Sequence, residues 1–174
     1  TAFHLAIADG KKYNVPVYVP ATTSGTGYLI TETLSCLQVS MIGEQGSTAN
    51  ISFDVGEWPT LRGGPDLRDI ILLSDSSPHA TTQSDRSVFE NFMIDMSYSP
   101  VSARGVVATC GMNQKQLRNL YIRDRTYVGD AHTTSQITSG YKTGVHLELL
   151  DTDNGGVYYN QIENIWTFGL WRGF

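Results

Sequence analysis

The chain has little charge, few cysteines and no long apolar runs. Only 17% of its 174 residues are charged, and the net charge is −5. Without a basic patch to engage a phosphate backbone, no nucleic-acid partner is expected. No apolar run approaches the roughly 20 residues of a membrane helix, so membrane insertion is not expected. Cys36 and Cys110 are too few for a disulfide framework, and their apolar, strand-like surroundings predict buried free thiols.

The first residues lack an initiator methionine and the charged and apolar regions of a signal peptide. We therefore expect a chain that was processed or cut from a longer polypeptide. What the chain does contain is glycine (17 residues) and tyrosine (9 residues), together with many serines and threonines. This composition is typical of β-rich extracellular or virion proteins, and the length suits a single domain over residues 1–174.

One helix is predicted, over residues 2–12. Phe3, Ala6 and Ile7 fall on one face, Thr1 is placed to cap the start, and Gly10 is placed to end the helix. After it, short runs of β-forming residues bounded by turn residues predict strands over 15–19, 28–30, 37–41 and 51–55.

A four-residue motif recurs in the rest of the chain: an apolar residue, a charged residue, Asn or Asp, and a second apolar residue. Its copies are Leu67-Arg68-Asp69-Ile70, Phe89-Glu90-Asn91-Phe92, Leu117-Arg118-Asn119-Leu120 and Ile162-Glu163-Asn164-Ile165. A glycine that leads a strand accompanies them in Arg104-Gly105-Val106, Thr143-Gly144-Val145 and Arg172-Gly173-Phe174. Such repeats indicate a solenoid. We predict a cap over 1–14, first coils over 15–66, and repeat coils over 67–174 that start at 67, 89, 117 and 162.

Stacking such coils would place equivalent residues about 4.8 Å apart. The apolar positions would then point inward, and the Asn or Asp positions would stack at one corner. Asn suits a corner because it tolerates left-handed conformations and its amides can bond to one another. The charged positions alternate in sign, so neighbouring copies attract by ~0.2–1 kcal/mol. The corner residues are Asp69, Asn91, Asn119 and Asn164, and the charged ones are Arg68, Glu90, Arg118 and Glu163.

The candidates for a catalytic or substrate-binding site are acidic, basic and aromatic residues. Hydrolysis of a glycosidic bond needs two carboxylates ~5–9.5 Å apart, a spacing that neighbouring coils provide. The catalytic candidates are Asp95 and Asp124, then Asp151 and Asp153; the alternative for each is an ordinary turn or strand-end acid. The candidates for substrate binding are Arg123, Arg125, His132, Trp166 and Trp171. Arginine could neutralise a substrate carboxylate and tryptophan could stack on a sugar ring, although such aromatics also pack between protomers.

Residues 151–156, Asp-Thr-Asp-Asn-Gly-Gly, resemble a calcium loop, with oxygen ligands at alternate positions. The distal glutamate of such loops is missing, and the same residues form ordinary turns. The four histidines show no metal-binding spacing. We therefore assign no metal ligands and expect no cofactor, with calcium at this loop as the alternative.

The opening residues and the repeated motif together resemble the pectate-lyase-like superfamily of right-handed parallel β-helices. The stretches that carry the resemblance are Val17-Tyr18-Val19-Pro20, Tyr28-Leu29-Ile30 and Met41-Ile42-Gly43-Glu44, followed by the motif copies. The turn at 21–27 is longer than the family's usual one, and 43–46 carries one extra residue. The resemblance implies an all-β fold, a right-handed single-stranded parallel β-helix with a short N-terminal capping helix and an incomplete C-terminal end.

Members of that superfamily include pectate and other polysaccharide lyases, glycoside hydrolases and bacteriophage tailspikes. The resemblance implies a tailspike-like protein for host-cell attachment, which recognises and in some members depolymerises bacterial surface polysaccharide. Such proteins are homotrimers, on a virion or outside the cell. Two alternatives stay open: a secreted polysaccharide lyase or glycoside hydrolase, and a non-catalytic structural β-helix of a virion or cell surface. The catalytic carboxylates of relatives usually lie in later coils, so those of this protein need not lie within these residues.

Overall fold

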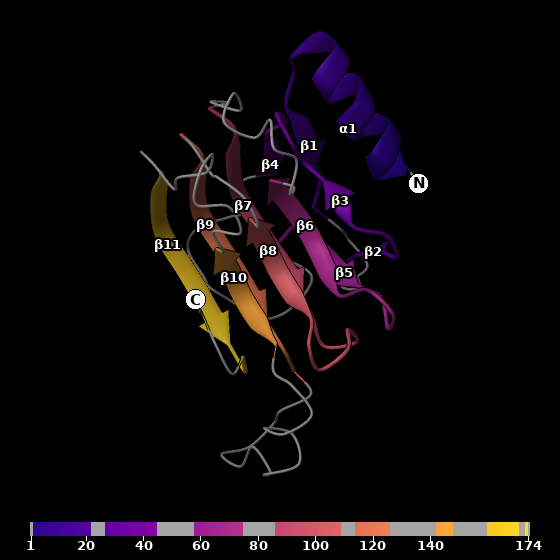
Figure 1. The fold of residues 1–174 in the computed structure, drawn as a ribbon, viewed down its shortest axis with the longest axis vertical. Coiled ribbons are helices and arrows are strands. Elements are labelled where there is room, and N and C mark those ends of the chain that lie inside the picture. The colour runs from indigo at the N-terminus through magenta and orange to yellow at the C-terminus, as the bar shows by residue number, and fades with distance from the viewer. Residues whose placement is uncertain are drawn as a thin grey trace, which may run out of the picture.

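The computed structural model describes residues 2–21, 27–44, 58–74, 86–108, 114–125, 142–147, 160–170 and 173. These residues are mostly β, with one helix, and their strands pair in parallel (Figure 1). The first sheet contains β1 (Val17–Val19), β2 (Tyr28–Ile30), β4 (Met41–Gly43), β5 (Thr60–Gly63), β7 (Val88–Asp95), β9 (Gln116–Arg123) and β11 (Gln161–Phe168). The second sheet contains β3 (Leu34–Ser35), β6 (Asp69–Ser74), β8 (Arg104–Ala108) and β10 (Thr143–Leu147). The predicted all-β class is confirmed to the extent that the described residues are mostly β strands in parallel sheets.

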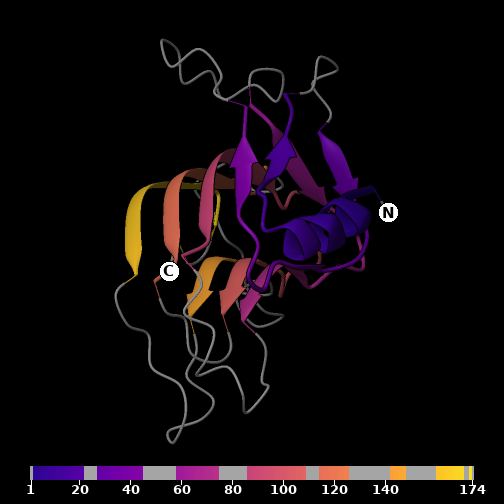
Figure 2. The same ribbon diagram turned by 90° about the horizontal axis from the view of Figure 1, so that it is seen from above.

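The chain alternates between the two sheets. It runs through β1 and β2 to β3, through β4 and β5 to β6, from β7 to β8, from β9 to β10, and then into β11. We call each such circuit a pass. Each pass pairs with the one before it, so sequence order becomes spatial order. Figure 2 shows the two sheets facing each other, with α1 (Ala2–Tyr13) at one end of the stack and β11 at the other.

The long strands of the first sheet bend at asparagine. Asn91 in β7, Asn119 in β9 and Asn164 in β11 have φ angles of 62°, 50° and 53°, in the left-handed region that asparagine tolerates. Nδ2 of Asn119 donates to Oδ1 of Asn91 at 3.1 Å, and Nδ2 of Asn164 donates to Oδ1 of Asn119 at 3.1 Å. The predicted asparagine corner is therefore confirmed for these three copies of the motif.

The copy of the motif at 67 does not belong to this corner. Asp69 lies in the second sheet, in register with Arg104 of β8, and accepts hydrogen bonds from Arg104 Nε at 2.6 Å and Nη2 at 2.7 Å. The predicted coil start at 67 is wrong, because a four-residue pattern can open a strand of either sheet. The other three copies are in register, with Phe89 opposite Leu117 and Leu117 opposite Ile162.

The strand-leading glycines form a column in the second sheet. Val145 lies opposite Val106, and its N–H donates to the carbonyl of Gly173 at 3.0 Å. A Cβ on Gly105 would lie 2.7 Å from the carbonyl oxygen of Gly144, and a Cβ on Gly144 would lie 2.8 Å from that of Gly173. Successive passes approach too closely here for a side chain, so the strand-leading glycines predicted from the sequence to accompany the coils do lie at equivalent places in neighbouring passes.

The predicted N-terminal helix is confirmed, but it ends at Tyr13 and not at Gly10. Asn14 takes a left-handed φ of 53°, and the N–H of Val15 donates to the carbonyl of Gly10 at 3.1 Å. This is a Schellman ending, in which asparagine rather than glycine supplies the left-handed residue. Phe3 and Ala6 pack against the core from this helix, so it covers one end of the stack.

The early strands match the sequence prediction in part. The strand at 28–30 is confirmed, and the strand predicted from 15 begins at Val17. The strand predicted over 37–41 is wrong, because Gln38 has a φ of 62° in a turn and β4 begins only at Met41. The strand β5 was not predicted, and the one predicted over 51–55 lies outside the described residues.

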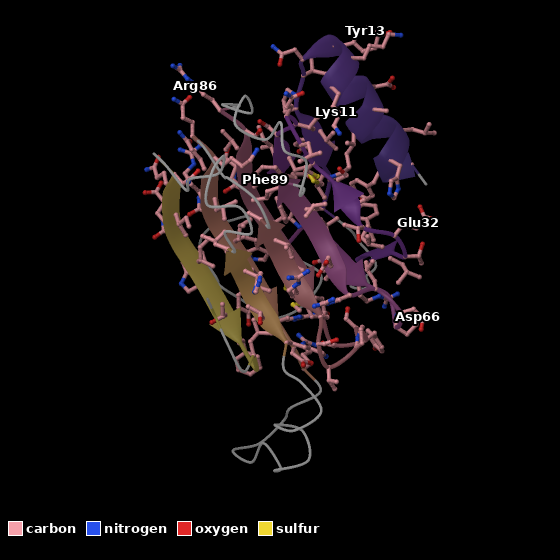
Figure 3. The ribbon with its side chains drawn as sticks, viewed as in Figure 1. Lys11, Tyr13, Glu32, Asp66, Arg86 and Phe89 are labelled. Carbon is pink, nitrogen blue, oxygen red and sulfur yellow. The ribbon has the colours of Figure 1, made fainter. Side chains whose placement is uncertain are left out.

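The core lies between the two sheets and consists of aliphatic and aromatic side chains that alternate with outward-facing residues. Figure 3 shows Phe89 among the strands in the body of the molecule and Tyr13 at the far end of α1. Cys36 is a buried free thiol, and its Sγ donates to Sδ of Met41 at 3.2 Å. Burial raises the pKa of Cys36 to about 12 in spite of two nearby lysines. The free-thiol prediction is confirmed for Cys36, while Cys110 lies outside the described residues.

Candidate functional site

Beyond the asparagine bend, the first sheet presents an outer surface that we call the outer face. Ile94 of β7 and Ile122 of β9 point into the core. Because side chains alternate along a strand, the residues on either side of each isoleucine point outward. These outward residues form two rows across the strands. One row is Thr60, Met93, Tyr121 and Trp166, and the other is Leu29, Arg62, Asp95, Arg123 and Phe168. The outer face thus brings together three predicted site residues, Asp95, Arg123 and Trp166.

The outer face is closed to solvent over β7 and β9 and open over β11. In the first row, Met93 is 1% exposed and Tyr121 is 6% exposed, whereas Trp166 is 40% exposed. In the second row, Asp95 and Arg123 are buried and Phe168 is 50% exposed. The second row is therefore open to solvent at Phe168 of β11 and again at Leu29 of β2, which is 52% exposed.

Asp95 and Arg123 form a buried ion pair in the second row. Arg123 Nη2 lies 2.8 Å from Oδ2 of Asp95, and the N–H and hydroxyl of Ser97 donate to Oδ1 at 3.0 and 2.5 Å. Burial alone would raise the pKa of Asp95, but the hydrogen bonds from Ser97 and Arg123 outweigh it and leave this pKa below its ordinary value. A general acid in glycoside cleavage needs a raised pKa, so Asp95 is poorly suited to that role.

Asp124 follows β9 and is enclosed between passes. Nζ of Lys142 lies 2.8 Å from Oδ2 of Asp124 and donates to the carbonyl of Met96 at 2.7 Å. The N–H of Asp124 donates to the carbonyl of Phe168 at 2.9 Å. Gly169, with a φ of 67°, packs against the Asp124 carbonyl where a Cβ would clash. Asp95 and Asp124 do lie on neighbouring passes, but both are ion-paired and closed to solvent, so their catalytic role stays a prediction that this geometry does not support.

The remaining predicted site residues are placed as follows. Arg125 is exposed, and its N–H donates to the hydroxyl of Ser97 at 2.9 Å, beside the Asp95 pair. The other candidates, Asp151, Asp153, His132, Trp171 and the proposed calcium loop at 151–156, lie outside the described residues.

Two residues of the outer face, Tyr121 and Arg62, were missed by the sequence reasoning. Burial raises the pKa of Tyr121, although Arg123 and Arg125 act to lower it. Strand alternation in 117–123 could have placed Tyr121 on the same side as Arg123. Arg62 lies in β5, the strand that was not predicted.

Comparison with known proteins assigns no family, because no family model, curated protein or solved structure matches this chain. Within the described ranges, no three or more His, Cys, Asp or Glu side chains are grouped so that they could hold a metal ion. The one helix that the structure describes is too short to cross a membrane. The function is therefore inferred from the arrangement of the passes and from the outer face.

Proposed function

We propose that this chain forms a right-handed parallel β-helix of the pectate-lyase-like type and that its outer face binds a bacterial surface polysaccharide, as tailspikes do. The parallel passes, the stacked asparagine amides and the glycine column all support the β-helix. Right-handedness agrees with the rule for parallel strands joined by crossovers. As in tailspikes, the protein would act as a homotrimer on a virion or outside the cell.

The observation that carries the proposal is the open aromatic end of the outer face. Trp166 and Phe168 lie two residues apart on β11 and remain 40% and 50% exposed. Large aromatic surfaces left in water mark sites of interaction, and sugar rings present apolar C–H faces that stack on them. Tyr121 lies beside Trp166 in the first row but is only 6% exposed, so Trp166 and Phe168 form the open aromatic surface.

The proposal is for binding without bond cleavage by the described residues. Cleavage needs carboxylates that touch the glycosidic bond, whereas Asp95 and Asp124 each contact a buried cation. The same ion pairs join β7 to β9, and the residue after β9 to Lys142, which precedes β10.

The test is binding of the full chain to an array of bacterial capsular polysaccharides and lipopolysaccharides. Replacing Trp166 by Ala should weaken binding about 5- to 10-fold, since an aromatic contact contributes ~1 kcal/mol and 1.4 kcal/mol is tenfold. The matched control is Tyr13→Ala, which removes an exposed ring at the far end of the stack and should leave affinity unchanged. The proposal fails if no polysaccharide is retained, or if Trp166→Ala and Tyr13→Ala bind equally well.

A further inference from the structure

We propose that Arg62 and Tyr98 form an anion-binding subsite at the β5 end of the outer face. It would take a carboxylate or phosphate group carried by the polysaccharide. The identity of the ligand as a polysaccharide rests on the proposed function, whereas the affinity of this subsite for an anion can be measured by itself.

Within the described part of the chain, Arg62 carries a charge that no acid neutralises. It lies opposite Asp95 in the register of β5 and β7, but both oxygens of Asp95 already have partners, Arg123 on one and Ser97 on the other. Among the described residues no ion pair involves Arg62, and its Nε is buried without a hydrogen-bond partner. Nε of Arg118 is also buried without a hydrogen-bond partner, but Arg118 pairs with Glu90; Arg62 differs in that no described acid pairs with it.

The guanidinium of Arg62 is held in place by an aromatic ring. Its Cζ lies 5.2 Å from the centroid of the Tyr98 ring. The turn that carries Tyr98 is fixed on both sides, because Ser97 hydrogen-bonds Asp95 and the N–H of Ser99 donates to the carbonyl of Met96 at 3.0 Å. A stacked guanidinium keeps its N–H edge free for two parallel hydrogen bonds to an oxyanion. Tyr98 is 63% exposed, so a ligand can approach from solvent.

The subsite lies on the same surface as the aromatic end. Arg62 and Phe168 belong to one row and are separated by three strand spacings, or about 14 Å. Between them lies the Asp95–Arg123 pair, which is closed and electrically neutral. In a chain with a net charge of −5, Arg62 therefore provides a local cation at the β5 end of the outer face, beyond the closed part.

The first experiment measures anion binding at the Arg62 subsite without a polysaccharide. The NMR signal of the Arg62 Nε–H, identified by its loss in Arg62→Lys, is followed while sodium glucuronate or inorganic phosphate is added to the full chain. We expect a saturating shift with at least one of these anions, and the anion that saturates at the lower concentration identifies the preferred group. A shift no larger than that caused by sodium chloride at equal ionic strength overturns the subsite.

The second experiment separates the subsite from the proposed function. It uses an acidic capsular polysaccharide retained on the array, in its native form and after chemical reduction of its carboxylates. Arg62→Gln should weaken binding of the native polymer about tenfold and leave the reduced polymer unaffected, because a bidentate charged hydrogen bond is lost only in the first case. The matched control is Arg118→Gln, which removes an arginine on the other side of the asparagine bend and should change neither affinity.

The two ideas can fail independently. If Arg62→Gln weakens both polymers equally or neither, the subsite is overturned, while a loss of affinity in Trp166→Ala would still support the aromatic face. If the Arg62 signal shifts with glucuronate or phosphate but Trp166→Ala binds every polymer as the wild type does, the subsite stands and the proposed polysaccharide face fails.

Discussion

Strands β7 and β9 carry two ion pairs of the same chemistry, one on each side of the asparagine bend. Before the bend, Arg118 Nη2 lies 2.6 Å from Glu90 Oε2, with side chains 33% and 19% exposed. After the bend, Arg123 Nη2 lies 2.8 Å from Asp95 Oδ2, with side chains 1% and 6% exposed. The members of each pair face each other in the same strand register. Distance and chemistry are nearly the same, so the two pairs differ mainly in burial.

That difference separates a structural surface from a candidate site. A solvent-exposed pair contributes ~0–1 kcal/mol because water and salt screen it. A buried pair repays the cost of leaving water only with further hydrogen bonds, which Ser97 supplies to Asp95. Before the bend, the outward-facing pair of these strands is partly exposed to solvent. After the bend, the outward-facing pair is buried, and exposure returns at Trp166 and Phe168 of β11.

The largest expected effect comes from removing Asp95. Asp95→Ala should lower the free energy of unfolding by about 3–5 kcal/mol, because Arg123 would stay buried without its partner. Chemical denaturation monitored by circular dichroism measures this change. The double variant Asp95→Leu/Arg123→Met replaces both charges by apolar groups and should be clearly less destabilised than Asp95→Ala. Equal losses in the two variants would show that packing volume, and not the buried charge, sets the cost.

A smaller effect is expected from acid. The pKa of Asp95 in the folded protein lies below its value in the unfolded chain, which is about 3.9. Ionised Asp95 therefore stabilises the fold above that pH, and this contribution disappears as the pH falls through the folded-state pKa. Unfolding free energies of the wild type and of Asp95→Asn, measured between pH 6 and pH 2, should converge on the acid side. Parallel curves would contradict the lowered pKa.

The asparagine corner shows what could be predicted from the sequence. Asn91, Asn119 and Asn164 recur in a fixed local pattern, and both the left-handed φ and the amide ladder depend only on the residue type and on parallel stacking. The charged position beside them behaves likewise, since Glu90 and Arg118 attract as their alternating signs predicted. Local chemistry that repeats from pass to pass is therefore predictable.

The burial of the outer face was not predictable in this way. Alternation places Met93 and Tyr121 on the outside of their strands, but it does not determine how much solvent each residue meets. For the same reason the sequence offered Asp95 and Asp124 as catalytic candidates but did not show that both are ion-paired and closed to solvent. The predicted place of Asp69 at the asparagine corner was wrong for a different reason. A short motif does not specify the sheet in which its strand lies.

The smallest expected effect comes from the less buried pair, Glu90 and Arg118, whose side chains are 19% and 33% exposed. Glu90→Ala and Arg118→Ala should each change the free energy of unfolding by no more than about 1 kcal/mol, and the coupling energy from the double variant should lie at ~0.2–1 kcal/mol. The same cycle on Asp95 and Arg123 should give a larger coupling that resists added salt, because the screening that weakens exposed charges does not extend to a closed pair. Since each pair joins the same two strands, a coupling for Glu90 and Arg118 as large as that for Asp95 and Arg123 would mean that strand pairing, and not burial, sets the strength of both.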